Sequence, residues 1–438
     1  MSDDTERVGL RIALVTTFYP PHSFGGDALF VRTLAHTLAR HGHDVEVIYD
    51  ADAFHALSAE KNFEALPEPS GVRVHRLSSR FPRLAALATH QAGRPTVHRR
   101  ELQRLLEPGR FDVVHYHNIS LVGGPGILAY GDGLKLYTTH EHWLICPTHV
   151  LWRHDRELCT EKQCLRCTLH YRRPPQIWRA TGLLERALEA IDALCVPTRF
   201  TAEMHAAVVE PSRIEVLPLF LPELDDGAPT GAAERERGDY FLYVGRLEKL
   251  KGLQTVLPCF GEDSPGELRV AGTGSFEPEL ERLADPSRVR FLGFVPPDDL
   301  TDLYRRARAV IVPSLTYEIS PLVVLEAFRA GTPVVARRLG PLPEMVERHE
   351  AGLLFENRHE LARALRRLGA DSSLADRLGE NARAAFERIW SEESFLRRYY
   401  VLIARWAEET GRRSIVDRLA TVAERRASIG LSPRPDAG

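Results

Sequence analysis

Apolar residues in the first fifty positions follow two different periods. A short apolar run at 11–17 precedes a loop rich in proline and glycine, an amphipathic stretch at 27–40 and a second apolar run at 44–50. The short runs predict strands, and the three- and four-residue spacing between them predicts a helix. We expect Asp27 to cap the start of this helix and Gly42 to end it, which gives a β-loop-α-β unit.

The same alternation continues to about residue 220. Strand-like runs follow one another, mostly separated by helix-length stretches, as a parallel sheet requires. They cover residues 111–117, 134–140 and 193–198. The pattern therefore predicts a doubly wound, Rossmann-like α/β domain over residues 1–220.

A change of composition at 221–239 predicts an interdomain linker, because this stretch loses the apolar periodicity and collects proline, glycine and charge. A second series of strand-like runs with helical segments between them then begins. We predict a second Rossmann-like domain over 240–395 whose strand ends face a shared cleft with the first. C-terminal helices and a tail over 396–438 complete the chain, and we expect fraying beyond about 428. The runs of the second series lie at 240–247, 267–274, 289–295, 308–314 and 333–338.

Composition narrows the class of protein. The 438 residues, 44% of them hydrophobic, are enough for two or three domains. With 57 basic against 60 acidic residues the net charge is only −3, so we expect no nucleic-acid partner. No apolar run of about 18 residues occurs, and the first residues are acidic where a signal peptide is basic. These features predict a cytoplasmic protein.

The sharpest chemical pattern lies in residues 313–335. Ser320 followed by Pro321 predicts the start of a helix, which Gly331 ends. Glu318 then lies in the loop after a strand, and Glu326 in the second turn of a largely apolar helix. A carboxylate in such a setting needs a partner. The partner would be a ribose hydroxyl or, as the alternative, a structural arginine.

Anion-binding groups accompany this pattern. The N–H groups at the start of the helix, near Leu322 and Val323, suit a phosphate. In residues 243–252 a strand ends at Gly245, and Arg246 and Lys251 follow in the adjacent loop. Two cations beside a helix N-terminus can neutralise a diphosphate leaving group. Together with the E-x7-E spacing, they indicate a nucleotide-sugar site.

The motifs VGRLEKLKG, VAGTGS, FLGFVP and EISPLVVLEAFRAGTPVVA resemble, in this order, the retaining glycosyltransferases of family 4, which share the GT-B fold. The resemblance spans roughly residues 10–400. It implies transfer of a sugar from a nucleoside-diphosphate sugar to an acceptor hydroxyl with retention of configuration and without a catalytic metal. It also implies that the C-terminal domain holds the donor and the N-terminal domain the acceptor.

The resemblance also implies roles for individual residues. Arg246 and Lys251 would bind the diphosphate, Glu326 the ribose and Glu318 the transferred sugar. His140 matches a histidine that faces the anomeric centre, and the alternative is a core imidazole satisfied by a neighbour. The expected catalytic residues are His140, Glu318, Arg246 and Lys251. The expected donor-binding residues are Gly25, Gly26, Gly245, Arg246, Lys251, Gly272, Val295, Glu318, Leu322, Val323 and Glu326.

Four cysteines fall close together in an insertion at 146–167: Cys146, Cys159, Cys164 and Cys167. The final C-x2-C is typical of a metal knuckle, and four thiolates fit tetrahedral zinc. An iron–sulfur cluster needs the same ligand count, although nothing indicates electron transfer. We expect a structural zinc that folds the insertion over the acceptor side. Unrelated buried or free cysteines are the alternative.

Nine arginines lie between residues 71 and 110. Such a stretch would suit an anionic membrane or a phosphorylated lipid acceptor, and a solvated helix face is the alternative. The first reading places the protein peripherally at the inner face of a membrane. The acceptor itself stays open among a glycan, a lipid and a small molecule. The arginines are at positions 73, 76, 80, 83, 94, 99, 100, 104 and 110.

The sequence leaves two other functions open. A nucleotide-sugar epimerase would use the same fold and donor, but the family-like E-x7-E segment favours a transferase. A binding module built on the cysteine knuckle would carry an inactive transferase body. The presence of Arg246, Lys251, Glu318 and Glu326 speaks against such a loss of activity.

Overall fold

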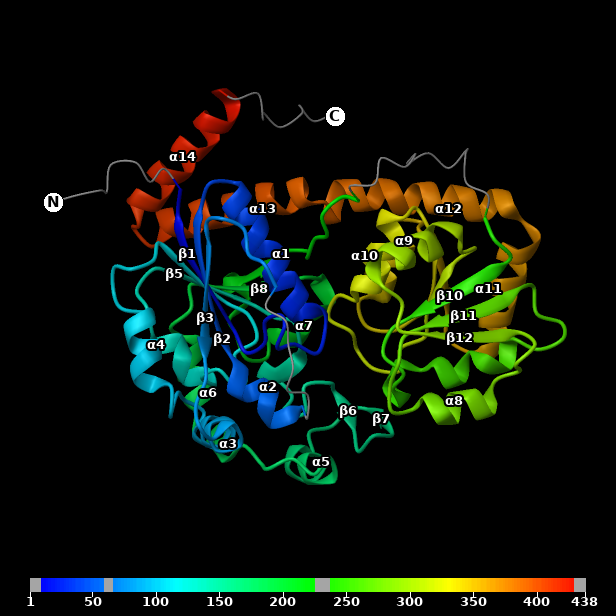
Figure 1. The fold of residues 1–438 in the computed structure, drawn as a ribbon, viewed down its shortest axis with the longest axis horizontal. Helices are drawn as coiled ribbons and strands as arrows, with labels where there is room; N and C mark the ends of the chain where they lie inside the picture. The colour runs from blue at the N-terminus through cyan, green and yellow to red at the C-terminus, as the bar shows by residue number, and fades with distance from the viewer. Residues whose placement is uncertain (1–8, 59–65, 225–236, 429–438) are drawn as a thin grey trace.

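Two α/β domains, each built on a parallel sheet, lie side by side in the computed structural model (Figure 1). The structure describes residues 9–58, 66–224 and 237–428. The central part of the predicted linker and the tail beyond residue 428 lie outside the described residues. The predicted fold class, GT-B with two Rossmann-like domains, is confirmed by two separate parallel sheets.

The first sheet has seven parallel strands in the order β3-β2-β1-β4-β5-β8-β9. Its inner strands are continuous apolar runs because helices cover both faces of a parallel sheet. Strand β5 is buried at every position, for example. The strands are β1 (Arg11–Thr16), β2 (Asp44–Asp50), β3 (Val72–Leu77), β4 (Val113–Tyr116), β5 (Leu134–Thr138), β8 (Ala193–Val196) and β9 (Ile214–Val216).

The second sheet has six parallel strands in the order β12-β11-β10-β13-β14-β15. The strand order reverses beside β10, the topological switch point at which open α/β sheets bind ligands. The strands are β10 (Tyr240–Val244), β11 (Glu267–Ala271), β12 (Val289–Gly293), β13 (Val310–Val312), β14 (Val334–Arg337) and β15 (Gly352–Phe355).

Helices cover the two sheets and continue to the end of the described chain. The first domain holds α1 (Gly26–Arg40), α2 (Ala51–Leu57), α3 (Pro82–Ala92), α4 (Arg99–Leu105), α5 (Cys164–His170), α6 (Leu183–Leu188) and α7 (Arg199–His205). The insertion adds a small antiparallel pair, β6 (Trp152–Arg153) and β7 (Glu157–Leu158). The rest are α8 (Glu277–Leu283), α9 (Pro297–Arg306), α10 (Leu322–Arg329), α11 (Arg358–Ala370), α12 (Ser372–Ala385), α13 (Glu392–Glu409) and α14 (Arg413–Ser428).

Two predicted helix starts are wrong by one or two residues. Helix α1 begins at Gly26 with Gly25 as its N-cap, so Asp27 lies in the first turn and does not cap it. Helix α10 begins at Leu322, and Ser320 does not cap it. Its N-cap is Pro321, whose ψ of 115° is extended. Pro321 therefore precedes the first turn instead of occupying it.

Three strands of the two parallel sheets were not predicted, β3, β9 and β15, and neither was the pair β6 and β7. Strand β3 carries alternating valines with basic residues and is half exposed, because it forms one edge of the first sheet. Its Arg73 and Arg76 belong to the arginine-rich stretch. That stretch also includes α3 and α4, on which Arg83, Arg99, Arg100 and Arg104 are exposed, so the alternative of a solvated helix face stays open for these helices.

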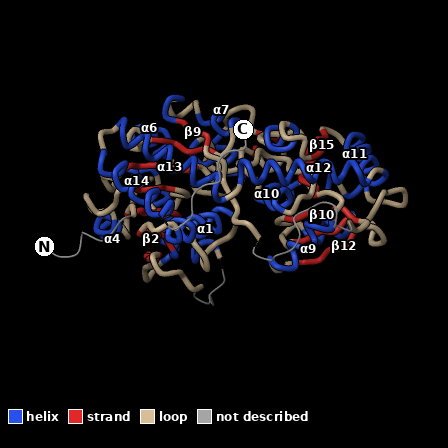
Figure 2. Tube along the Cα trace, turned by 90° about the horizontal axis from the view of Figure 1, so that it is seen from above, coloured by secondary structure: helices blue, strands red, loops and turns tan. Residues whose placement is uncertain are grey.

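The C-terminal helices join the two domains. Helices α11 and α12 lie on the second domain, and α13 and α14 return to the first (Figures 1 and 2). The hydroxyl of Tyr399 in α13 lies 3.0 Å from Nδ1 of His115 in β4. Phe395 packs against Phe220 with ring centroids 4.5 Å apart. The end of the described chain is therefore part of the packing of the first domain.

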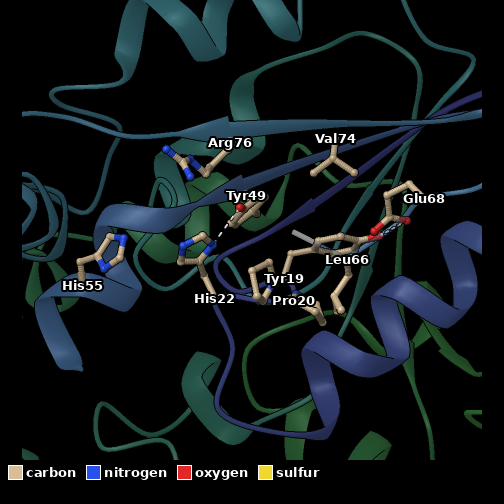
Figure 3. Close-up of a pocket in the computed structure, with 10 residues that line it drawn as sticks. Tyr19, Pro20, His22, Tyr49, His55, Leu66, Glu68, Val74 and Arg76 are labelled. Carbon is tan, nitrogen blue, oxygen red and sulfur yellow. Dashed lines mark hydrogen bonds between the residues drawn. The ribbon is translucent and has the colours of Figure 1, made fainter. Parts of the chain in front are cut away.

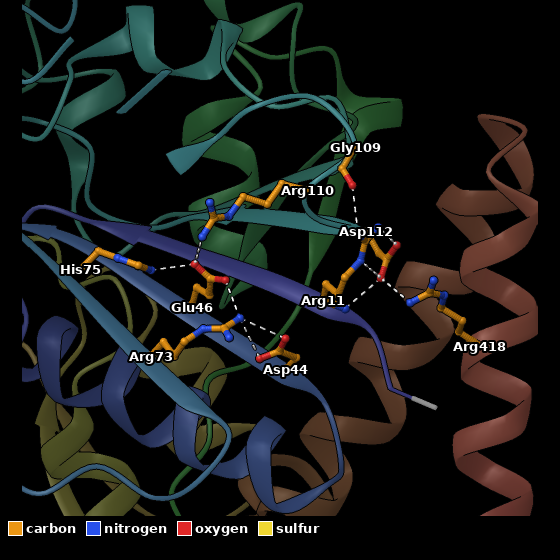
Figure 4. A network of polar contacts seen from close by, with 9 residues as sticks. All are labelled: Arg11, Asp44, Glu46, Arg73, His75, Gly109, Arg110, Asp112 and Arg418. Carbon is orange, nitrogen blue, oxygen red and sulfur yellow. Dashed lines mark hydrogen bonds and ion pairs between the residues drawn. The ribbon is translucent and has the colours of Figure 1, made fainter. Parts of the chain in front are cut away.

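A polar network ties the amino ends of the first sheet together (Figure 4). Glu46 of β2 accepts hydrogen bonds from Arg73 (2.6 Å), His75 (2.6 Å) and Arg110 (2.7 Å). Burial alone would raise the pKa of Glu46, but the hydrogen bonds from His75 and Arg110 and the arginine charges lower it to about 2. Arg418 of α14 reaches Asp112 at 3.4 Å in the same region.

Candidate active site between the two domains

Glu318 lies in the loop between β13 and α10, at the carboxyl edge of the second sheet. Its Oε1 accepts hydrogen bonds from Nζ of Lys251 at 2.8 Å and from Oγ of Ser314 at 2.6 Å. Burial alone would raise the pKa of Glu318, but the charge and hydrogen bond of Lys251 outweigh burial and lower it. Glu318 is therefore an ionised carboxylate paired with an ammonium, with Ser314 as a partner that the sequence pattern did not single out.

Lys251 reaches Glu318 because two loops approach closely. Lys251 is the last residue of a short 3₁₀ turn after β10, and Gly252 follows it with a φ of 80°. A Cβ on Gly252 would lie 2.1 Å from the carbonyl oxygen of Pro313, so only glycine fits there. Lysine carries three N–H donors, and within the described chain its ammonium donates to Glu318 alone. Two donors are therefore left for an anionic ligand.

Arg246 lies on the same loop but points to a different partner. Its Nη1 donates to Oε1 of Glu248 at 2.7 Å, and 60% of its side chain is exposed. The structure thus brings Lys251 and Glu318 into contact and leaves Arg246 in the solvent beside them.

Glu326 is partly buried in the second turn of α10. Its Oε2 accepts a hydrogen bond from the hydroxyl of Tyr304 in α9 at 2.5 Å. Burial and the charge of Glu326 hold the pKa of Tyr304 well above its usual value, so Tyr304 stays a donor. The expected structural arginine is not the hydrogen-bonding partner. A tyrosine on the preceding helix has this role, and no spacing in the sequence indicated it.

Two glycines let the loops after β10 and β11 meet. Gly245 and Gly272 have φ of 153° and 137°. A Cβ on Gly272 would lie 2.0 Å from the carbonyl oxygen of Gly245. Val295, also predicted at the site, is partly buried in the loop between β12 and α9. All three residues follow the carboxyl ends of neighbouring strands.

The glycine loop of the first domain touches the second domain. A Cβ on Gly26 would lie 2.7 Å from Cδ1 of Leu322, the first residue of α10, whereas one on Gly25 would find its nearest atom at 3.8 Å. Val323 follows Leu322 and is also partly buried. The N-termini of α1 and α10 therefore meet where the predicted donor residues gather.

His140 lies two residues beyond β5, on the side of the first domain that carries the glycine loop. Its Nε2 lies 2.9 Å from Nδ1 of His117, and its ring packs on Phe30. Burial lowers the pKa of His140 to about 4, so the imidazole is neutral near pH 7. His117 is thus the neighbour that would satisfy His140 if its imidazole were a core residue, although His140 itself is only partly buried.

His117 and His115 were not predicted as site residues. His115 lies on buried β4 and His117 directly follows this strand, and the two rings are tilted by 31° with centroids 4.2 Å apart. Nε2 of His115 lies 2.7 Å from Oγ1 of Thr138, and its Nδ1 lies near Tyr399. The signal that could have found them is the H-x-H at the end of an otherwise apolar strand.

The cysteine insertion reaches the second domain. The hydroxyl of Thr316, two residues before Glu318, donates a hydrogen bond to the carbonyl oxygen of Val150. Nζ of Lys249, in the turn that carries Lys251, donates to the carbonyl oxygen of Asp155 at 3.0 Å. The insertion therefore contacts both loops that form the Lys251–Glu318 pair, which the sequence had not indicated.

All four predicted metal-binding cysteines are free thiols; Cys146 and Cys167 are buried and Cys164 is exposed. Burial raises the pKa of Cys159, and the charges of the other three cysteines add to the effect. Among the described residues, only Asp50, Asp52 and His98 bring three ligand atoms within 4.8 Å of one another. The zinc assignment stays a prediction.

Two family profiles cover most of the chain. Glycosyltransferase Family 4 matches residues 24–221, and glycosyl transferases group 1 matches residues 230–385. A D-inositol 3-phosphate glycosyltransferase of Xylanimonas cellulosilytica is 30% identical over 425 residues, 88% of this chain and 94% of the relative. The chain belongs to glycosyltransferase family 4. An uncharacterized glycosyltransferase of Methanocaldococcus jannaschii is 26% identical to this chain. The matched region is 85% of this chain and 93% of the relative.

Solved structures share the fold of this glycosyltransferase. Sucrose-phosphate synthase of Thermosynechococcus elongatus gives a TM-score of 0.65 at 19% identity and covers 90% of this chain and 98% of its own. HepE of Anabaena, solved in complex with UDP, gives 0.59 at 18% identity and covers 90% and 100%. No helix among the described residues is long and apolar enough to cross a membrane.

Proposed function

We propose that this glycosyltransferase moves a sugar from a nucleoside diphosphate to an acceptor hydroxyl with retention at the anomeric carbon. The observation that carries the proposal is the ion pair between Lys251 and Glu318 beside the N-terminus of α10. It combines a cation with free donors, an ionised carboxylate and the start of a helix at one point. This set suits a sugar diphosphate. The UDP complex of HepE supports a nucleotide donor.

Each predicted residue then has a defined task. Lys251 and Arg246 would stabilise the charge that grows on the leaving phosphate, as the metal-free mechanism expected from the family requires. Glu318 would accept hydrogen bonds from hydroxyls of the transferred sugar. Glu326, already oriented by Tyr304, would accept from the ribose hydroxyls. The glycines at 245 and 272 would leave room for the donor.

The reaction breaks the bond between the anomeric carbon and the phosphate oxygen and forms one to the acceptor oxygen. The acceptor proton passes to the leaving phosphate. His140 is a neutral hydrogen-bonding group, since burial keeps its pKa near 4. His117 restricts His140 to a few orientations through the contact between their ring nitrogens.

The test is turnover with a panel of UDP-, GDP-, ADP- and TDP-sugars. We expect slow release of free nucleoside diphosphate from one of them in water, and an α-linked product by NMR from an α-linked donor when an acceptor is present. Conversion of the donor to its epimer without release would favour the epimerase. Binding without release in any condition would favour an inactive binding module.

The cysteine insertion supports a second part of the proposal, a structural zinc held by Cys146, Cys159, Cys164 and Cys167. Burial raises the pKa of Cys159 and Cys164, and the charges of Cys146 and Cys167 add to the effect. Sγ of Cys167 lies 3.5 Å from the backbone nitrogen of His154. Five of the six described non-glycine residues with positive φ lie at 149–172, a backbone that a metal would hold in place. Metal analysis should find one zinc per chain. Four reactive thiols with no metal would contradict it.

Membrane contact through the arginine-rich stretch is the third part. In α3 and its N-cap, Phe81, Leu84 and Leu87 are 59%, 63% and 46% exposed and recur every three residues on one side. Arg80 and Arg83 lie beside them. Apolar residues flanked by arginines fit an anionic lipid surface.

Vesicles with 30% phosphatidylglycerol should sediment the protein at low salt, and a Leu84→Ser, Leu87→Ser variant should stay in solution. Equal sedimentation of both proteins would contradict this site.

A further inference from the structure

A cavity of about 500 Å³ opens at the carboxyl ends of β1, β2 and β3 (Figure 3). One wall is the loop that follows β1 and leads to Gly25 and Gly26. Another is the pair Tyr49 and Arg76, which are register partners on β2 and β3. The cavity therefore belongs to the domain expected to hold the acceptor, at the edge of the sheet where parallel folds bind ligands.

The floor of this cavity is aromatic and neutral. Tyr19, His22 and Tyr49 are at most 4% exposed. Nδ1 of His22 lies 3.0 Å from the hydroxyl of Tyr49, and the two rings stack at 5.8 Å. Burial, with the charge of Arg76 contributing, lowers the pKa of His22 to about 4. This floor offers aromatic rings and the hydroxyls of Tyr19 and Tyr49, which suit a sugar or polyol ring.

The two charged groups of the cavity differ in their partners. Glu68 is satisfied, because Tyr19 (3.2 Å), Arg32 (3.2 Å) and His36 (2.5 Å) all bind its carboxylate. Arg76 is exposed and forms no hydrogen bond or ion pair with any described residue. Arg73, two residues earlier on β3, is by contrast paired with Glu46. Among the described residues, the cavity thus presents one positive charge without a hydrogen-bonding or ionic partner at its rim.

We propose that this cavity holds the acceptor and that the acceptor carries an anionic group, a phosphate or a carboxylate, which Arg76 binds. The inference rests on the proposed glycosyl transfer and names the class of acceptor. A guanidinium forms paired hydrogen bonds to such groups, and the aromatic floor would pack against the ring that bears the reacting hydroxyl. The loop from His22 to Gly25 connects this cavity to the donor site.

The anionic group can belong to a free metabolite or to a lipid headgroup, and titration calorimetry with small probes distinguishes the two. The first arm compares glycerol 3-phosphate with glycerol, and the second compares monomeric dihexanoyl phosphatidylglycerol with dihexanoyl glycerol. We expect at least one anionic probe to bind tenfold or more tightly than its uncharged partner. The preferred arm identifies the source.

The variant Arg76→Gln should lose this preference, because one charge-assisted contact corresponds to roughly a tenfold to hundredfold change in affinity. Arg76→Lys should keep part of it. Arg186→Gln, an exposed arginine on α6 outside both the cavity and the arginine-rich stretch, should bind as the wild type does. Equal binding of charged and uncharged probes by the wild type, or an unchanged preference in Arg76→Gln, would overturn the inference.

UDP affinity and slow donor hydrolysis are measured on the same proteins. Arg76 lies outside the donor loops, so both should be unchanged in Arg76→Gln. A wild type that neither binds nor hydrolyses any nucleotide sugar would instead contradict the proposed function. The two failures are therefore distinguishable.

Discussion

Replacing Lys251 by methionine tests the donor site at its most specific contact. The variant keeps the length and apolar stem of the side chain but removes the ammonium that lies 2.8 Å from Glu318. The two donors available to a diphosphate disappear with it. Loss of one charge-stabilising group typically lowers kcat by about 10²–10³. We therefore expect sugar transfer by Lys251→Met to fall at least about a hundredfold.

The same change also has a cost in stability. Glu318 and Lys251 keep 16% and 26% of their side chains exposed. Breaking a fully buried pair costs about 3–5 kcal/mol, and partial exposure reduces this to about 2 kcal/mol. A domain of this size would melt roughly 4–8 °C lower. Activity is therefore measured at 25 °C, with circular dichroism confirming that the variant is folded.

A second substitution separates the two effects. Glu318→Gln in the Lys251→Met background removes the unpaired carboxylate, so the melting temperature should recover while transfer stays low. Lys249→Met, from the same turn but bonded to Asp155, serves as the matched control and should keep transfer within about threefold. A folded Lys251→Met protein with turnover within tenfold of wild type would refute the reasoning.

Three further changes test the scaffold. Gly272→Ala places a Cβ 2.0 Å from the carbonyl oxygen of Gly245 and should lower the free energy of unfolding by about 3 kcal/mol or more in urea titrations. Gly261→Ala is the control, because a Cβ at that position meets nothing within 4 Å. Equal effects of the two substitutions would contradict the close approach of Gly272 to Gly245. Tyr399→Phe removes the partner of buried His115 and should cost about 2 kcal/mol by the same measurement, and an unchanged midpoint would argue against this tie between α13 and β4. Glu46→Gln should cost about 2 kcal/mol at pH 7. Because the folded pKa of Glu46 is about 2, below its ordinary 4.5, the wild type should lose this advantage as pH falls from 4.5 toward 2, and a constant difference would contradict the network.

Most of the fold could be predicted from local patterns of apolar and polar residues. The apolar runs of β1, β2 and β10 and the amphipathic α1 are strong because each is buried against a whole layer. Strand β3 was missed since an edge strand with valines and arginines lacks a buried face. The start of α10 was misplaced because Ser320-Pro321 fits a capped helix equally well, and only the extended ψ of Pro321 decides.

The site was predictable where it depends on sequence spacing. Glu318 and Lys251, 67 residues apart, were both chosen from motifs, and the structure joins them. Tyr304, His117 and Tyr399 could not be chosen, because their contacts arise from packing between distant elements. The contact of the cysteine insertion with the loops at Lys249 and Thr316 is likewise a property of the folded chain.

The donor site is tested most directly by a crystal structure with a bound nucleoside diphosphate, the one whose sugar the donor panel selects. We expect the diphosphate within hydrogen-bonding distance of Nζ of Lys251 and of the N-terminus of α10, with Arg246 turned from Glu248 toward it and the ribose hydroxyls on Glu326. A nucleotide bound at another place, with the Lys251–Glu318 pair intact and untouched, would contradict the proposed site.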